Sequence, residues 1–194
     1  MKEDRKDQTI SEKVAKLMAD QISRELYNHN AYRTFANFYY KLGLCKLSQY
    51  YQLRAFEEYN HHSWLFDRLT QSGVEFEYPK VDAIKPGHLI TKPEQSFPIT
   101  VNLEIETTEW INGIVKQCLE EGDYITEQWL KEVMLGEQHE EENISRHIQA
   151  ITEDDTDWLT KQDTILSYYN NREYATDIQR DIINTEKVDE EDND

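Results

Sequence analysis

Residues 56–66 read FEEYNHHSWLF, in which two adjacent glutamates, Glu57 and Glu58, are followed by His61, three positions after the second. The aromatic and aliphatic residues around them favour burial. Residues three apart lie on one face of a helix, so Glu58 and His61 can reach the same point in a protein interior. This stretch therefore predicts a helix that carries carboxylates and an imidazole into the core, and the rest of the chain has to supply a reason for burying them.

The composition indicates one helical domain. The chain of 194 residues (23.2 kDa) is long enough for a single well-filled core, and six glycines, four prolines and a charged fraction of 31% fit a helical protein with a solvated exterior. No apolar run reaches the roughly 18 residues that a membrane span needs. The start, MKEDRKDQTI, is too polar for a secretory signal. We therefore expect a cytoplasmic protein that has no membrane partner.

Charge and cysteine content narrow the possible ligands. The formal net charge of -18 repels phosphate backbones, so nucleic acid is not an expected partner and cations are the natural ligands. Cys45 and Cys118 form no CxxC pair, which argues against a disulfide framework and against a thiolate zinc site.

The first half of the chain predicts a helical hairpin followed by a crossover. The stretch Thr9-Ile10-Ser11-Glu12 has capping-box spacing and opens a periodic pattern that runs to Gly43. A second pattern ends at Gly73, which is well placed to terminate a helix. Residues 78–98 show no periodicity and contain all four prolines of the chain, Pro79, Pro86, Pro93 and Pro98. An extended segment here would span the bundle, roughly 35–40 Å for about 25 helical residues.

The second half predicts another hairpin and a short final helix. The helical pattern returns from Thr100 to about Glu121, turns at Gly122-Asp123 and continues to about Ile151, and the segment Thr156–Arg172 suggests a fifth helix. The fold class is thus all-α, a four-helix bundle with a long crossover between helices 2 and 3 and a short C-terminal helix. The expected divisions are an N-terminal extension (1–8), the bundle (9–152), a C-terminal helix segment (153–185) and a disordered acidic tail (186–194).

Each long helix carries glutamate in its inward-facing apolar stripe. On the four helices these are Glu25, Glu58, Glu104 and the pair Glu137 and Glu141. The mean of positions 25 and 58 is 41.5, beside the first turn, and the mean of positions 104 and 141 is 122.5, inside the second turn. Residues equidistant from a turn lie level on antiparallel helices. The carboxylates are therefore predicted to meet at one height.

Several carboxylates buried together cannot all remain ionised alone, because burial is costly and like charges repel. Multivalent cations resolve the conflict. Glu58 and His61 could bind one metal ion while the second oxygen of Glu58 bridges to another. Ligands rich in oxygen and poor in nitrogen suit iron or manganese better than a closed tetrahedral zinc site. The pattern therefore predicts a dinuclear metal site.

With these residues identified, the chain resembles the ferritins, specifically the non-haem bacterial type, over residues 10–152. The matching segments are SRELYNHNAY, EEYNHHSWLFDRL, LEIETTEWIN, EEGDY and EQHEEEN. The resemblance implies a ferritin-like bundle in which Glu25, Glu58 and His61 hold a first iron. The second iron would be held by Glu58, Glu104 and Glu141.

The resemblance also implies further roles around the site. Gln138 matches a glutamine near the second iron, and Tyr32 matches a tyrosine beside the site, where it is either a redox group or a core tyrosine whose hydroxyl is hydrogen-bonded. An adjoining third iron site would be formed by Glu57, Glu137, Glu140 and Glu141.

Three departures from the family pattern stand out. Tyr59 follows Glu58 where haem-binding relatives carry a methionine, so no haem is expected. The stretch from the second turn to Glu137 is one residue longer than in the family pattern. The tail after Ile151 is longer and more polar, which affects the region that lines the fourfold pores of a ferritin shell.

The function that the resemblance implies is iron storage with ferroxidase activity. Fe(II) would be oxidised to Fe(III) by dioxygen or hydrogen peroxide at the dinuclear site, and the product would be stored as a mineral inside a homo-oligomeric shell of 24 subunits. Two alternatives remain open from the residues alone. One is a diiron-carboxylate oxidase of low oligomeric state, and the other is a helical interaction module that binds no metal.

Overall fold

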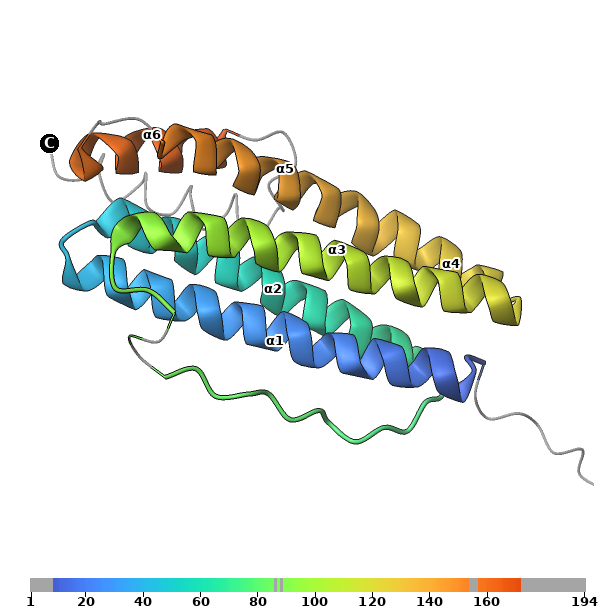
Figure 1. Ribbon diagram of the computed structural model, residues 1–194. Helices are drawn as coiled ribbons and strands as arrows, with labels where there is room; N and C mark the ends of the chain where they lie inside the picture. The colour runs from blue at the N-terminus through green and yellow to red at the C-terminus, as the bar shows by residue number, and fades with distance from the viewer. Residues whose placement is uncertain (1–8, 86, 88, 154–156, 172–194) are drawn as a thin grey trace, which may run out of the picture.

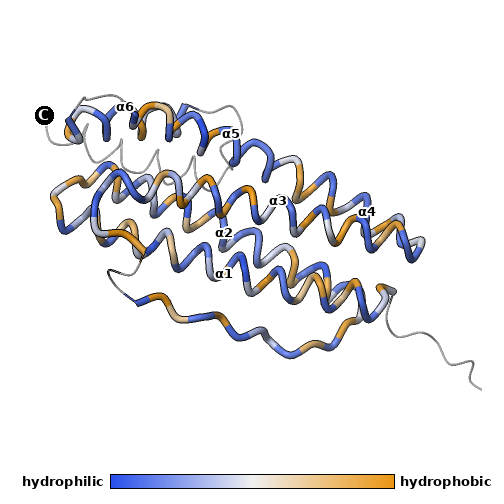
Figure 2. The backbone as a smooth tube through the Cα atoms, in the orientation of Figure 1, coloured by the Kyte–Doolittle hydropathy of each residue, from blue (hydrophilic) through white to orange (hydrophobic). Residues whose placement is uncertain are grey.

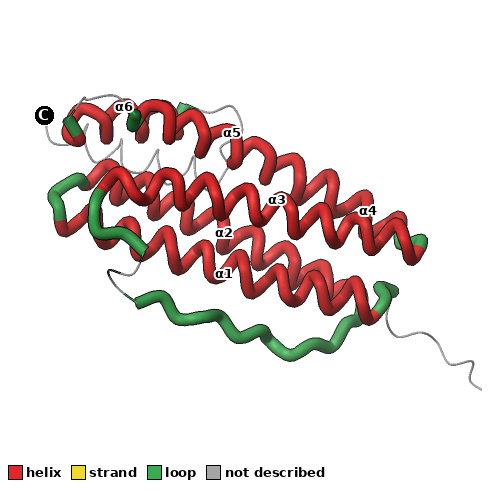
Figure 3. Tube along the Cα trace, in the orientation of Figure 1, coloured by secondary structure: helices red, strands yellow, loops and turns green. Residues whose placement is uncertain are grey.

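The computed structural model describes residues 9–85, 87, 89–153 and 157–171. All regular secondary structure in this part of the chain is helical (Figure 1 and Figure 3). The elements are α1 (Glu12–Lys41), α2 (Cys45–Gln71), the short 3-10 helix η1 (Pro93–Gln95), α3 (Ser96–Glu121), α4 (Tyr124–Trp129), the π-helix η2 (Leu130–Leu135), α5 (Gly136–Ile151) and α6 (Trp158–Asn170). None of these helices combines the length and the apolar composition needed to span a membrane.

Two helical hairpins form the bundle, as predicted. Helices α1 and α2 pack along their length, and α3 packs against both α5 and α1. Between the hairpins, residues 74–85 carry no helix and run along the outside of α1 toward the opposite end of the bundle (Figure 1). The all-α bundle with a long crossover between its second and third long helices is therefore confirmed.

The first helix begins two residues later than the capping-box spacing from Thr9 predicts. Ser11 is the N-cap, and its hydroxyl accepts a hydrogen bond from the backbone N–H of Val14 at 3.2 Å. Thr9 instead donates its backbone N–H to the carbonyl of Ser72 at 2.9 Å, so it ties the chain start to the end of α2. Assigning the cap to Thr9 was wrong, because that residue has a tertiary partner.

The start of α3 also differs from the sequence expectation. The helix begins at Ser96 rather than near Thr100, and Pro98 lies in its first turn. Proline is compatible with this position because the first N–H groups of a helix have no intrahelical acceptor. The last of the four prolines therefore lies inside α3 and does not mark the end of the crossover. Pro86 lies outside the described residues.

The fourth helix of the bundle is divided into α4, η2 and α5 rather than being one regular helix. A π-helix closes i→i+5 hydrogen bonds, so one π turn holds a residue more than an α turn. This segment lies between the second turn and Glu137, where the resemblance implied one extra residue. The π turn holds one residue more than an α turn would, and Gln138 and Glu141 in the following α5 lie buried.

The core consists of two apolar clusters separated by a polar layer. Hydrophobic and hydrophilic positions alternate along every long helix (Figure 2). One cluster contains Met18, Ile22 and Leu65, and the other is rich in aromatic residues. The positions between them on each helix are those of the inward glutamates, which include Glu25 and Glu58. The predicted polar layer therefore interrupts the core at one height.

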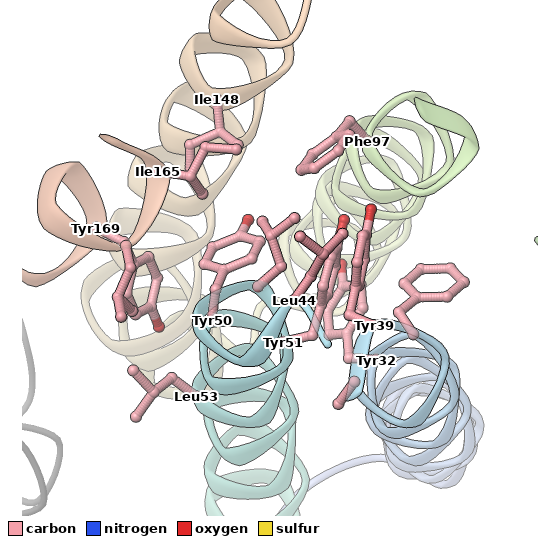
Figure 4. Close-up of a cluster of buried hydrophobic side chains, with 14 of the residues drawn as sticks. Tyr32, Tyr39, Leu44, Tyr50, Tyr51, Leu53, Phe97, Ile148, Ile165 and Tyr169 are labelled. Atoms are coloured by element: carbon pink, nitrogen blue, oxygen red, sulfur yellow. The ribbon is translucent and has the colours of Figure 1, made fainter. Parts of the chain in front are cut away.

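The aromatic cluster attaches the C-terminal helix to the bundle (Figure 4). The ring of Tyr169 on α6 packs edge-on against Tyr50 on α2, with 5.1 Å between ring centroids, and Trp158 stacks on Phe97 of α3. A fifth helix is thus present, at Trp158–Asn170. Its predicted end points and the proposed segments 1–8 and 186–194 lie outside the described residues, so the division into segments stays a prediction.

Candidate metal centre

Four helices bring their inward carboxylates into the polar layer. Glu25 on α1, Glu58 on α2, Glu104 on α3 and Glu141 on α5 are all at most 2% exposed, and so is His61. Because each pair is equidistant from its turn, these side chains were predicted to lie level with one another, and the structure brings them together.

The ligand atoms form three groups whose members lie within 4.8 Å of one another. The first contains Glu25, Glu58 and His61, and the second contains Glu58, Glu104 and Glu141. Glu58 belongs to both, as expected for a bridging carboxylate. A third group joins His61 to Glu137 and Glu141, a combination that the sequence analysis did not anticipate.

The oxygens of these groups are short of hydrogen-bond donors. Within the described residues, both oxygens of Glu58, both of Glu141, one of Glu25 and the Nδ1 of His61 have no hydrogen-bond partner. His61 Nδ1 lies 3.8 Å from Glu25 Oε2 and 3.9 Å from Glu58 Oε2. These separations are too long for hydrogen bonds, and an ion between the atoms would satisfy all three. The donor set therefore fits a cation.

Burial and mutual repulsion shift the proton affinities of this layer. Burial, followed by the charges of Glu104 and Glu25, raises the pKa of Glu58 well above its usual range. Burial also raises the pKa of Glu141, although His61 opposes that shift. Burial alone would lower the pKa of His61, but the surrounding carboxylates, with Glu141 first, raise it to about 10. Without metal, the layer therefore holds protons that cations would displace.

Tyr32 and Gln138 both hold Glu104 in place. The hydroxyl of Tyr32 donates to Oε1 of Glu104, and the side-chain amide of Gln138 donates to Oε2 at 2.6 Å. Tyr32 is fully buried, and that burial raises the pKa of its hydroxyl well above the usual range. Both residues thus lie beside the second group, as the sequence analysis expected.

Arg54 is also fully buried in this layer, and the sequence patterns did not predict it as part of the site. Its guanidinium donates to Glu57 Oε2 at 2.8 Å and to Oε1 of Glu104. The sequence did contain a signal, because a residue four positions before Glu58 shares its helix face.

The residues expected to hold a third iron are not gathered as a group. Glu57 is 1% exposed and is bonded to Arg54, whereas Glu137 and Glu141 lie near Nε2 of His61, at 4.0 and 3.6 Å. Glu140 is partly exposed and belongs to none of the three ligand groups found among the described residues. The third iron site stays a prediction.

Comparison with known proteins agrees with this architecture. A family model described as a ferritin-like domain matches residues 15–153. The ferritin BfrB of Mycolicibacterium smegmatis is 30% identical over 125 residues, covering 64% of this chain and 67% of that protein. A probable bacterial non-haem ferritin-like protein of Haemophilus influenzae is 30% identical over 135 residues, covering 70% and 80%. The bacterial non-haem ferritin of Campylobacter jejuni is 29% identical over 146 residues, covering 72% and 81%.

Solved structures share the fold. An open-pore ferritin from the archaeon Archaeoglobus fulgidus matches with a TM-score of 0.74 and 25% identity, over 81% of this chain and 96% of that chain. A closed form engineered from the ferritin of the same archaeon matches with a TM-score of 0.72 and 24% identity, over 86% and 100%. The family match over most of the sequence, together with these relatives, shows that this chain belongs to the ferritin family and is of its bacterial non-haem type.

Proposed function

We propose that this protein is a cytoplasmic iron store with ferroxidase activity. It would oxidise Fe(II) to Fe(III) at a dinuclear centre inside each subunit and keep the product as a mineral within a homo-oligomeric shell of 24 copies. The observation that carries the proposal is the layer of buried carboxylates from four helices, in which both oxygens of Glu58, both of Glu141 and one of Glu25 have no hydrogen-bond partner among the described residues. Membership of the ferritin family supports iron as the cation.

The proposed centre binds its two iron ions through ligands of one chain. Glu25, Glu58 and His61 would bind the first ion, and Glu58, Glu104 and Glu141 the second. Two Fe(II) ions supply two electrons, which reduce dioxygen to hydrogen peroxide or hydrogen peroxide to water with uptake of two protons. No haem takes part in this proposal.

The surrounding residues of the chain prepare the centre for its substrate. His61, whose pKa is raised to about 10, gives up its proton when an ion binds at Nδ1, and Glu58 does the same. Their two protons are thus released as positive charge enters, which offsets two of the four charges that two Fe(II) ions bring. Tyr32 and Gln138 keep the carboxylate of Glu104 in a fixed orientation, and we assign both a positioning role.

A single experiment tests the proposal. Metal-free protein is loaded with Fe(II) in air, oxidation is followed by absorbance, and the product is separated by size exclusion with iron analysis of each fraction. We expect saturable oxidation and iron that elutes with an assembly some 24 times heavier than 23.2 kDa. Oxidation by a monomer or dimer would indicate a diiron-carboxylate oxidase instead. Absence of saturable oxidation would favour a helical interaction module.

A further inference from the structure

Arg54 places a permanent positive charge where three carboxylates converge. Its Nη1 lies 2.8 Å from Glu57 Oε2 and 3.7 Å from Glu141 Oε2, and its Nη2 is bonded to Oε1 of Glu104. The side chain is 0% exposed. The guanidinium is therefore in contact with carboxylates from α2, α3 and α5 at once. The positive charge at this point belongs to the protein itself.

A guanidinium in this position competes with an additional metal ion for Glu57 Oε2 and Glu104 Oε1, and it leaves Oε2 of Glu104 and both oxygens of Glu141 without a hydrogen bond to Arg54. Arginine remains charged under all ordinary conditions, so it cannot leave its partners by losing a proton. It also repels a divalent ion placed within a few ångströms in a poorly solvated interior. Glu57 Oε2 accepts a hydrogen bond from Arg54 at 2.8 Å, and the Glu57 side chain is 1% exposed. Its charge is therefore neutralised by Arg54 and not by a metal ion.

The remaining ligand groups cannot all be filled together. A neutral imidazole has one nitrogen lone pair available, because the other nitrogen carries the proton. His61 can therefore serve the first group through Nδ1 or the third group through Nε2, but not both. With the first and second groups filled, the third group retains only Glu137 and a shared Glu141.

We propose that Arg54 is a fixed cation that takes the place of an additional metal ion, so that the centre binds two ions tightly and Glu57 is not an iron ligand. The inference rests on the proposed function, since it concerns the same centre. It removes Glu57 from the third iron site that the family resemblance implied. Arg54 is thus a positioning residue that sets the number of ions.

Counting tightly bound ions tests this role without relying on oxidation. Metal-free protein is titrated anaerobically with Co(II), and the number of tight ions per subunit is measured by calorimetry and equilibrium dialysis. We expect two ions in the wild type and two in Glu57→Gln. Arg54→Ala should bind one more, because Glu57, Glu104 and Glu141 then face an open position. Arg54→Lys, which keeps the charge, should stay at two, and so should the double variant Arg54→Ala/Glu57→Gln.

The outcomes separate this inference from the proposed function. If Glu57→Gln binds one ion fewer than the wild type, Glu57 is a ligand and the inference is overturned. An unchanged count in Arg54→Ala overturns it as well. Should Arg54→Ala fail to fold, the comparison of Glu57→Gln with wild type still decides. A wild type that binds no Co(II) refutes the dinuclear centre itself, and the inference falls with it.

Discussion

At Glu58, burial and the neighbouring carboxylates act in the same direction on one carboxyl group. The side chain is 1% exposed, and neither of its oxygens has a hydrogen-bond partner among the described residues. Burial, Glu104 and Glu25 raise its pKa, so the folded apo protein keeps the proton to a higher pH than the unfolded chain does. Glu58 therefore serves metal binding at the expense of apo stability.

Glu58→Gln should abolish rapid Fe(II) oxidation and stabilise the apo protein. Because the folded-state pKa is raised, the contribution of Glu58 to stability is complete below the unfolded value of about 4.3 and declines as pH rises above it. Glutamine does not ionise, so the variant escapes this loss. The two apo proteins should melt together near pH 4, and the variant should gain on the order of 1 kcal/mol near pH 7. Thermal melts of chelator-treated protein and stopped-flow oxidation measure both effects.

A control variant separates this effect from a general response to glutamine. Glu109 is exposed on α3, so Glu109→Gln should leave both the melting temperature and the oxidation rate close to wild type. If Glu58→Gln instead melts well below wild type and still oxidises iron, Glu58 belongs to a structural hydrogen-bond network. In that case the dinuclear assignment is wrong.

Sequence patterns located the inward glutamates but not the arginine beside them. The position of a residue in the helical repeat decides the face on which its Cβ lies. The apolar face of each helix and the equal distances from the turn therefore predicted correctly that Glu25 and Glu58 lie inside the bundle. The guanidinium of Arg54 is separated from its backbone by a flexible stem, so helical phase does not determine where the charge lies. Arginine is also rarely buried without partners, and two of the partners of Arg54, Glu104 and Glu141, come from other helices.

At the scale of elements, helices could be predicted and their hydrogen-bonding details could not. Long periodic patterns and glycine stops gave the hairpins, because burial of one face imposes the period. The π turn at Leu130–Leu135 has no residue signature, since it depends on where α5 must place its side chains to meet α3. The start of α3 was missed because proline is permitted in a first turn as well as in a loop.

Deleting Glu132 from the π turn should leave the metal centre intact. The residue is exposed, and its removal lets the segment close regular α-helical hydrogen bonds while Glu137 and Glu141 keep their face. We expect oxidation within about twofold of wild type and unchanged or higher stability, because distant sites contribute independently. Circular-dichroism melts and oxidation rates provide the measurement.

A matched deletion in a regular α-helix shows whether the tolerance expected at Glu132 comes from the π turn. Glu109 is equally exposed but lies in the regular helix α3. Its deletion rotates one part of α3 by about 100° relative to the other, which turns Ile111 and Ile114 out of the core. Strong destabilisation is expected for this variant. If the Glu132 deletion destabilises as severely, the π turn is required by the fold and does not simply hold an extra residue.

At the scale of the whole molecule, exposed apolar side chains gather at both ends of the bundle. Tyr40 and Leu42 flank the turn between α1 and α2, and Leu119, Tyr124 and Ile125 flank the turn between α3 and α4. These two turns lie at opposite ends of the bundle (Figure 1). Ile125 is 75% exposed, which is unfavourable for a surface that meets only water. Such patches at opposite ends favour contacts between copies of the chain, in agreement with a homo-oligomer.

Storage should therefore be separable from oxidation. Every ligand of the proposed centre comes from one chain, whereas retention of a mineral needs a closed shell. The double variant Leu119→Glu/Ile125→Glu places charges in the apolar patch at the α3–α4 turn, and should lower the mass seen by light scattering from an assembly to small species. Because this turn is remote from the centre, Fe(II) oxidation should remain within about twofold of wild type. The Fe(III) formed should then precipitate rather than elute with protein.

A substitution at an exposed polar position serves as the control for the double variant Leu119→Glu/Ile125→Glu. Glu132→Gln alters an exposed residue on the same hairpin and should keep both the assembly and the retained iron. A wild-type protein that is a stable monomer or dimer at micromolar concentration would contradict the shell. If the double variant loses oxidation together with assembly, the centre depends on a neighbouring subunit. Retention of iron by a protein that no longer assembles would show that storage does not need the shell, because a single bundle would then be holding the oxidised metal.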